Sequence, residues 1–116
     1  MKERGEAKLL RIFIGESEKY KGIPVYEKIV LSAREHSLAG ATVIKGVMGY
    51  GRNSVIHTSK LLALSSDMPI IVEIVDVIEK IEKFIPFLNE IFEDSNSAGL
   101  ITLEKVEVIK YTSNKS

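Results

Sequence analysis

The chain contains 116 residues, of which 45% are hydrophobic and 28% are charged. This size and balance are typical of one globular domain and exclude a disordered chain, because enough apolar surface is available to offset the entropy of ordering. Sixteen basic side chains balance sixteen acidic ones and cysteine is absent, so we expect no nucleic-acid binding, no disulfide and no thiolate metal site.

The remaining composition argues against a membrane span and a metal centre. The longest apolar runs have the length of strands, far below the ~20 residues of a membrane helix. Residues 1–8 are polar and do not resemble a signal peptide, so the sequence predicts a cytoplasmic protein. With only two histidines, His36 and His57, we expect no histidine-rich metal site. We also expect no bound metal and no required cofactor.

The first half of the chain predicts a strand, a helix and a second strand. Residues 9–14 form a short apolar run that indicates a buried strand. A helix is expected over about residues 24–37, because Pro24 suits a first helical turn and apolar side chains follow at helical spacing. Residues 41–48 are rich in β-branched side chains and predict a strand, whereas residues 49–54 are expected to form only a turn.

The second half repeats this pattern after a short extra strand. We expect that short strand at residues 60–64 and a strongly apolar strand, buried on both faces, at residues 70–75. Asp76 is expected to cap a second helix, whose apolar stripe is interrupted by Pro86 and should bend there. A last strand is expected over about residues 100–111.

This order of elements predicts an α+β fold. Two strand–helix–strand units describe a ferredoxin-like βαβ–βαβ sandwich with an antiparallel sheet and one extra short strand. We expect one domain over residues 1–116 with frayed ends at about 1–7 and 112–116. Both faces of the inner strands are apolar, but helices cover only one face. The open face therefore predicts self-association.

One segment has a composition suited to ligand binding. Gly46, Gly49 and Gly51 lie close together and are followed by Arg52. Glycines allow backbone N–H groups to approach a phosphate, and an arginine could add a bidentate contact. The spacing fits neither the dinucleotide fingerprint nor the P-loop, so a turn in which the glycines merely reverse the chain is the alternative.

Two further polar residues have both a functional and a structural explanation. His57 is either a hydrogen-bonded structural residue or a ligand-binding one. Glu73 lies inside an apolar run and needs a partner, which could be a lysine, an arginine or a ligand. No nucleophile, base and orienting residue can be assembled from the sequence, so binding is favoured over catalysis.

The same segments resemble a known family. The chain is similar to the PII-like branch of small bacterial and archaeal proteins over about residues 8–111. The matching segments are residues 9–16 (LLRIFIGE), 40–43 (GATV), 46–51 (GVMGYG), 56–58 (IHT), 69–76 (PIIVEIVD) and 106–111 (VEVIKY). The classical PII nitrogen-signalling proteins are more distantly similar, and residues 49–52 (GYGR) resemble the Gly-Phe-Gly-Arg element at the base of their T-loop.

The resemblance implies a homotrimer that binds an adenine nucleotide in clefts between subunits. Thr42 matches a nucleotide-facing threonine, Glu73 and Val75 match the strand that borders the adenine, and Lys110 matches a phosphate-binding arginine. Together with the glycine-rich segment, the implied nucleotide site comprises Gly49, Tyr50, Gly51, Arg52, Asn53, His57, Thr42, Glu73, Val75 and Lys110.

The chain also departs from the classical PII pattern. One additional residue lies between Gly40 and Gly49, which predicts a bulge or a shifted register. The lysine of the family's phosphate loop is missing from residues 96–99, and a second phosphate-binding arginine is replaced near Thr112. These losses favour AMP, ADP or a cyclic adenine nucleotide over tight ATP binding. No counterpart of the modified T-loop tyrosine follows Arg52, so we expect no uridylylation.

The resemblance implies a signalling or sensor protein that is not an enzyme. It would bind AMP, ADP or ATP and regulate a partner, for instance a membrane transporter, through a responsive loop at residues 50–60. Two alternatives remain open. One is a nucleotide hydrolase with His57 as base and Arg52 stabilising charge. The other is a metal-ion tolerance protein, which would need carboxylate ligands.

Overall fold

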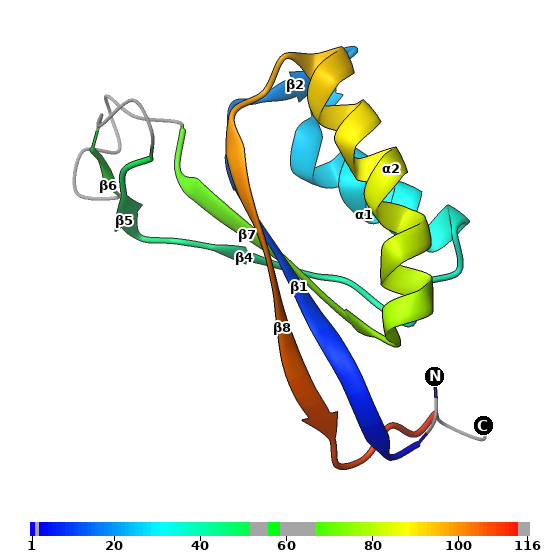
Figure 1. Cartoon of the computed structure of the whole chain (residues 1–116). Coiled ribbons are helices and arrows are strands. Elements are labelled where there is room, and N and C mark those ends of the chain that lie inside the picture. The colour runs from blue at the N-terminus through cyan, green and yellow to red at the C-terminus, as the bar shows by residue number, and fades with distance from the viewer. Residues whose placement is uncertain (2, 52–55, 59–66, 114–116) are drawn as a thin grey trace.

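The computed structural model describes residues 1, 3–51, 56–58 and 67–113. Its elements follow one another from blue to red in Figure 1. In chain order they are β1 (Gly5–Gly15), β2 (Lys19–Tyr20), β3 (Ile23–Pro24), α1 (Val25–Glu35), β4 (Thr42–Lys45), β5 (Met48–Gly49), β6 (His57–Thr58), β7 (Pro69–Asp76), α2 (Ile78–Ser95) and β8 (Gly99–Val108).

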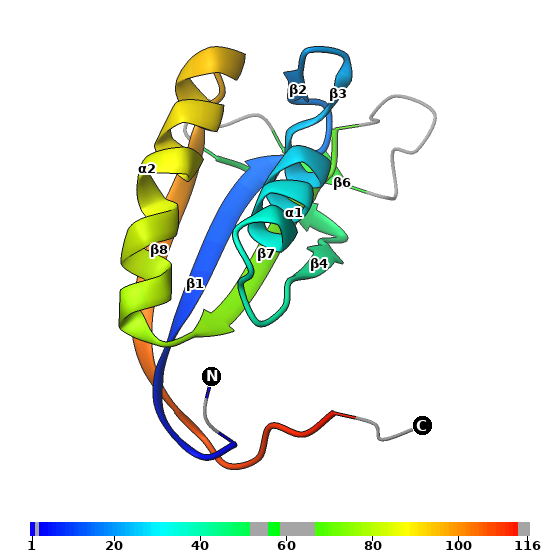
Figure 2. The same ribbon diagram turned by 90° about the vertical axis from the view of Figure 1, so that its right-hand side faces the viewer.

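The main sheet has four strands in the order β4-β7-β1-β8, and all three pairs are antiparallel. Both helices lie on one face of this sheet, and the other face is open (Figures 1 and 2). The two strand–helix–strand units interleave, so that β1 and β7 form the centre. The predicted α+β, ferredoxin-like sandwich is confirmed.

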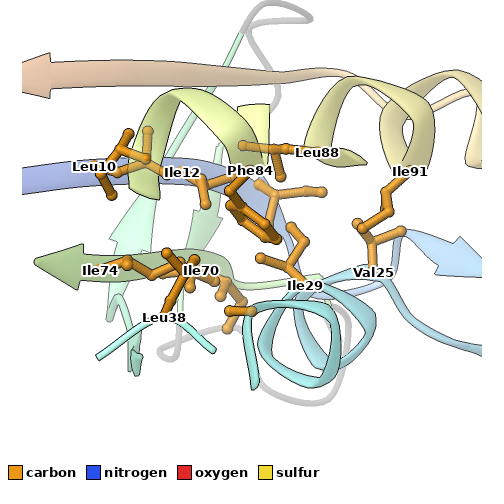
Figure 3. Close-up of a cluster of buried hydrophobic side chains, with 14 residues drawn as sticks. Leu10, Ile12, Val25, Ile29, Leu38, Ile70, Ile74, Phe84, Leu88 and Ile91 are labelled. Atoms are coloured by element: carbon orange, nitrogen blue, oxygen red, sulfur yellow. The ribbon is translucent and has the colours of Figure 1, made fainter. Parts of the chain in front are cut away.

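The hydrophobic core fills the space between the sheet and the helices (Figure 3). Because successive side chains of a strand point to opposite faces, alternate residues of β1 and β7 reach this core. The strands contribute Leu10, Ile12, Ile14, Ile70, Val72 and Ile74. The helices contribute Val25, Ile29, Ala33, Ile81, Phe84, Leu88 and Ile91.

The boundaries of three elements differ from expectation, and the last strand, expected to reach residue 111, ends at Val108. β1 begins at Gly5, so residues 5–7 belong to a strand rather than to a frayed end; they pair with β8 in a ribbon that extends past the helices (Figure 1). The strand expected over residues 41–48 is divided into β4 and β5, and Gly49 is part of β5 rather than only of a turn. The short strand expected at residues 60–64 lies outside the described residues.

The prediction that Asp76 caps α2 is wrong. The N-cap residue is Val77, whose side chain makes no capping hydrogen bond. The buried carboxylate of Asp76 instead accepts hydrogen bonds from the N–H of Val77 at 2.7 Å and of Ala39 at 2.9 Å. It therefore ties the end of β7 to the loop after α1.

α1 begins one residue after Pro24 and ends at Glu35, close to the expected range. α2 continues through Pro86 as one helix, and the bend expected there stays a prediction. The C-cap of α2 is Asn96, in the left-handed conformation that often ends helices. No helix in the described part of the chain has the length and apolar character needed to cross a membrane.

Candidate functional site

The glycine-rich segment forms part of a small hairpin beyond the sheet. β5 pairs with β6 through Met48 opposite Thr58 and Gly49 opposite His57. The hairpin projects past the end of β4, away from the helices (Figure 1). Tyr50 follows β5, and 70% of its surface is exposed, so its aromatic ring is available to a ligand or a second molecule.

The glycines of this hairpin differ in what surrounds them. A Cβ atom on Gly49 would lie 3.2 Å from Cγ of Pro69, so close packing accounts for this glycine. A Cβ atom on Gly51 would meet no atom of the described residues within 4 Å, and the backbone of Gly51 does not have a positive φ. Local structure therefore gives no steric reason for a glycine at position 51.

Arg52, Asn53 and His57 of the predicted site are not fully placed by the structure. Arg52 and Asn53 are outside the described residues, as are residues 54–55 and 59–60 of the predicted responsive loop. His57 is placed by its backbone in β6. The roles of these residues in binding stay predictions.

A second group of predicted residues shares the open face of the sheet. Thr42 of β4 lies directly opposite Glu73 of β7, and Val75 lies two residues further along the same face. Lys110 is exposed in the segment after β8. The hydroxyl of its neighbour Tyr111 donates to the carbonyl of Ala39 at 3.2 Å, which places this segment near the start of β4.

Glu73 has a partner within the chain. Nε of Arg11 donates to Oε2 of Glu73 at 2.9 Å, and the same guanidinium contacts Glu104 on β8. The hydrogen bond with Glu73 raises the pKa of Arg11 above its usual value, with partial desolvation opposing it. Sequence reasoning missed Arg11, although a charged residue inside the apolar run of β1 was the signal for it.

The predicted site residues therefore fall into two groups. Gly49, Tyr50 and Gly51 lie in the hairpin, whereas Thr42, Glu73 and Val75 lie toward the other end of β4 (Figure 1). Seven steps of extended chain from Thr42 to Gly49 span up to roughly 23 Å. Among the described residues, the two groups therefore lie at opposite ends of this stretch of chain.

A cavity in the described region lies elsewhere. It has a volume of about 540 Å³ and lies between the start of β1 and the start of α2. None of the predicted site residues that the structure describes lines it. Among the described residues, no three carboxylate or imidazole side chains are grouped as a metal site would require.

A family model matches nearly the whole chain. The DUF190 family, described as "Uncharacterized ACR, COG1993", matches residues 7–108. The chain belongs to the DUF190 family. A UPF0166 protein of Aquifex aeolicus (strain VF5) is 48% identical over 102 residues, which cover 88% of this chain and 92% of that protein.

Solved structures assign the fold. CPII, a nitrogen regulatory PII-like protein from Thiomonas intermedia K12 bound to ADP, AMP and bicarbonate, matches with a TM-score of 0.68 and 16% identity over 90% of both chains. A putative PII-like signaling protein from Thermus thermophilus matches with a TM-score of 0.63 and 17% identity, over 93% of this chain and 94% of that one. The predicted resemblance to PII-like proteins is confirmed.

Proposed function

We propose that this DUF190 protein is a PII-like sensor that binds an adenine nucleotide between copies of the chain and regulates a partner protein. The observation that carries the proposal is the PII-like fold shared with CPII, whose structure contains ADP, AMP and bicarbonate. AMP and ADP are the preferred ligands, because the sequence lacks two phosphate-binding cations of the classical PII pattern.

The two groups of site residues have different roles in this proposal. The hairpin supplies Gly49, Tyr50 and Gly51, with Arg52, Asn53 and His57, to the phosphates. Thr42, Glu73, Val75 and Lys110 border the adenine. Because the two groups lie toward opposite ends of β4, a nucleotide that contacts both is bound where the hairpin of one copy meets the open face of another.

The open sheet face supports assembly of this kind. Its apolar side chains include Leu9, Phe13, Ile44, Ile71, Val75 and Leu100. Of these, 42% of Ile44 and 57% of Leu100 are exposed in the isolated chain. Exposed apolar side chains on both sides of the Arg11–Glu73 pair favour an interface on this face. We propose that other copies cover it, and the PII resemblance sets their number at three.

The proposal is tested by ligand stabilisation. AMP, ADP, ATP and cyclic AMP are compared in a thermal-unfolding panel, in which a ligand of the folded state raises Tm further as its concentration rises. We expect AMP or ADP to give the largest shift, and light scattering to give the mass of a trimer. No shift with any of the four nucleotides would contradict the proposal.

We propose that binding occurs without turnover, since the PII-like neighbours are described as regulatory and signalling proteins. Incubation with ATP and ADP followed by separation of the nucleotides checks this. Release of phosphate that is lost in a His57→Ala variant would favour the hydrolase instead. The regulated partner, with a membrane transporter as one example, would be recovered in a nucleotide-dependent pull-down.

A further inference from the structure

The turn after β1 contacts the chain on both sides of the β5–β6 hairpin, at the end of β4 and just before β7. We call this place the base of the hairpin. Oε2 of Glu16 lies 3.0 Å from Nζ of Lys45, the last residue of β4. The backbone N–H of Glu16 donates to the carbonyl of Met68 at 2.9 Å, and the N–H of Met68 donates to Oε1 of Glu16 at 3.4 Å. One residue is thus bonded both to the chain that leaves β4 and to the chain that enters β7.

Two further hydrogen bonds join the same three stretches of chain at the base of the hairpin. Oδ1 of Asp67 accepts a hydrogen bond from the N–H of Ser17 at 2.8 Å. This approach needs a glycine at position 15, because a Cβ atom there would lie 2.7 Å from the same oxygen. Across the base, the N–H of Gly46 donates to the carbonyl of Pro69 at 2.7 Å.

The Glu16–Lys45 pair is more sheltered than the exposed ion pair on the β1–β8 ribbon. The side chains of Lys45 and Glu16 are 56% and 25% exposed and lie 3.0 Å apart, whereas those of Lys105 and Glu6 are 76% and 70% exposed and lie 3.9 Å apart. Exposed pairs contribute little, because water screens them and their long side chains lose entropy. Glu16 also makes backbone bonds, which fix its geometry independently of Lys45.

The hairpin needs such support. Among the described residues, β5 and β6 pair through two residues each, and an isolated two-stranded hairpin is at best marginally stable in water. Its placement therefore depends on the direction in which the chain leaves β4. Lys45 is the last residue before this departure, and Glu16 holds its ammonium group.

We propose that Glu16 is a positioning residue for the nucleotide site, acting through Lys45 and Met68 to fix the place of Gly49, Tyr50 and Gly51. The part of this inference that concerns ligand binding rests on the proposed function. The part that concerns the hairpin does not. Glu16 itself contacts no ligand in this arrangement.

The test compares Glu16→Gln with Glu6→Gln in the full-length protein. Both changes remove one carboxylate charge from an ion pair, but only the first is at the hairpin base. The amide NMR signals of Gly46, Gly49 and Gly51 report the placement of the hairpin, and calorimetry gives Kd for ADP and AMP. Urea unfolding at fixed protein concentration reports stability.

We expect Glu16→Gln to shift the three glycine signals and to raise Kd by about threefold to tenfold, which is less than the loss of a charge-assisted bond to the ligand itself because Glu16 acts only through the hairpin. Glu6→Gln should change neither. The free energy of unfolding should be similar in both variants. If Glu16→Gln does not fold, Lys45→Met removes the same ion pair from its exposed side.

A charge swap provides the rescue. Lys45→Glu alone should shift the glycine signals, and the double variant Glu16→Lys with Lys45→Glu should move them back toward wild type. Glycine signals in Glu16→Gln that match those of Glu6→Gln would overturn the proposal. Shifted signals with an unchanged Kd would overturn the positioning role.

If the wild type binds none of the nucleotides, the proposed function fails. The glycine signals would still decide whether Glu16 fixes the placement of the hairpin.

Discussion

The two faces of the four-stranded sheet are built from alternate residues of the same strands, yet they carry different chemistry. On the helix-covered face, Ile12 and Val72 are completely buried, and Phe84 of α2 packs over them with 1% exposure. On the open face, the neighbouring positions carry Arg11 and Glu73, which form an ion pair. The side chains of the covered face are buried by the helices of the same chain. The open face has no such cover among the described residues and carries both apolar and charged side chains.

This difference separates stability from function within one sheet. A charged pair would be costly on the covered face, because desolvation would have to be offset by perfect pairing. On the open face the pair is part-exposed and is tolerated. We therefore expect substitutions of the covered face to change folding, and substitutions of the open face and hairpin to change assembly and binding.

The largest effect is expected on the covered face. Phe84→Ala should lower the free energy of unfolding by about 3–5 kcal/mol, because it leaves a cavity in the core. Phe87→Ala is the matched control on the same helix. Phe87 is 42% exposed and stacks on His36 with 3.9 Å between ring centroids, so its loss should cost about 1 kcal/mol or less. Equal losses in urea unfolding would show that the covered face is not the main source of stability.

Asp76 gives the next effect. Asp76→Ala leaves the N–H groups of Ala39 and Val77 without their acceptor, and should cost about 2–3 kcal/mol of unfolding free energy. Asp94→Ala, at an exposed position of α2, is the control and should be nearly neutral. If Asp76→Ala were as stable as Asp94→Ala, its hydrogen bonds would not hold the loop after α1.

Asp76 also shows where sequence reasoning ends. An acidic residue just before a helix has the same local pattern whether it caps that helix or bonds to Ala39, 37 residues earlier in the chain. The helices and the central strands were predictable, because their apolar spacing is local. The pairing of Arg11 with Glu73, and of Glu16 with Lys45, depends on strand register, which no local pattern contains.

The candidate site was predictable to a smaller degree for the same reason. The segment around Gly49 is recognisable by its composition, and the resemblance to PII proteins adds Thr42, Glu73, Val75 and Lys110. The separation of these residues toward the two ends of β4 becomes visible only in the fold. The reason for Gly49, which is the close approach of Pro69, is likewise a tertiary contact.

For ligand binding, the largest effect is expected from Arg52. If this guanidinium holds a phosphate, Arg52→Ala should weaken ADP binding by about tenfold to a hundredfold, which corresponds to a lost charge-assisted contact of about 1.5–3 kcal/mol. Arg34→Ala, which changes an exposed arginine of α1, is the control for charge. Calorimetry that gives the same Kd for both variants would place the phosphate elsewhere.

The open face is tested by two leucines of β8. Leu100 lies opposite Phe13 on the open face, and Leu103 lies opposite Leu10 on the helix side. Leu100→Lys should weaken assembly by about tenfold or more, because it introduces a charge into the proposed apolar contact between copies. Leu103→Lys, at a position that is also part-exposed, should leave assembly unchanged. Light scattering across a dilution series distinguishes the two, and equal behaviour would contradict an interface on this face.

The smallest effects are expected from two glycines of the hairpin segment. Gly49→Ala should lower the free energy of unfolding slightly, because the new methyl group would lie 3.2 Å from Cγ of Pro69. Gly51→Ala should leave stability unchanged or raise it by up to about 1 kcal/mol, since the position is open and its φ is not positive. Urea unfolding of both variants checks this order.

Binding then decides what Gly51 is for. If the backbone at position 51 approaches a phosphate, Gly51→Val should weaken ADP binding although no atom of the described residues would lie within 4 Å of its Cβ atom. Positive φ does not contribute to this effect, so any loss measured by calorimetry reports contact with the ligand. An unchanged Kd in Gly51→Val, with stability also unchanged, would mean that this glycine only joins the hairpin to the residues after it. The phosphate would then have to be sought at the other end of β4, near Lys110.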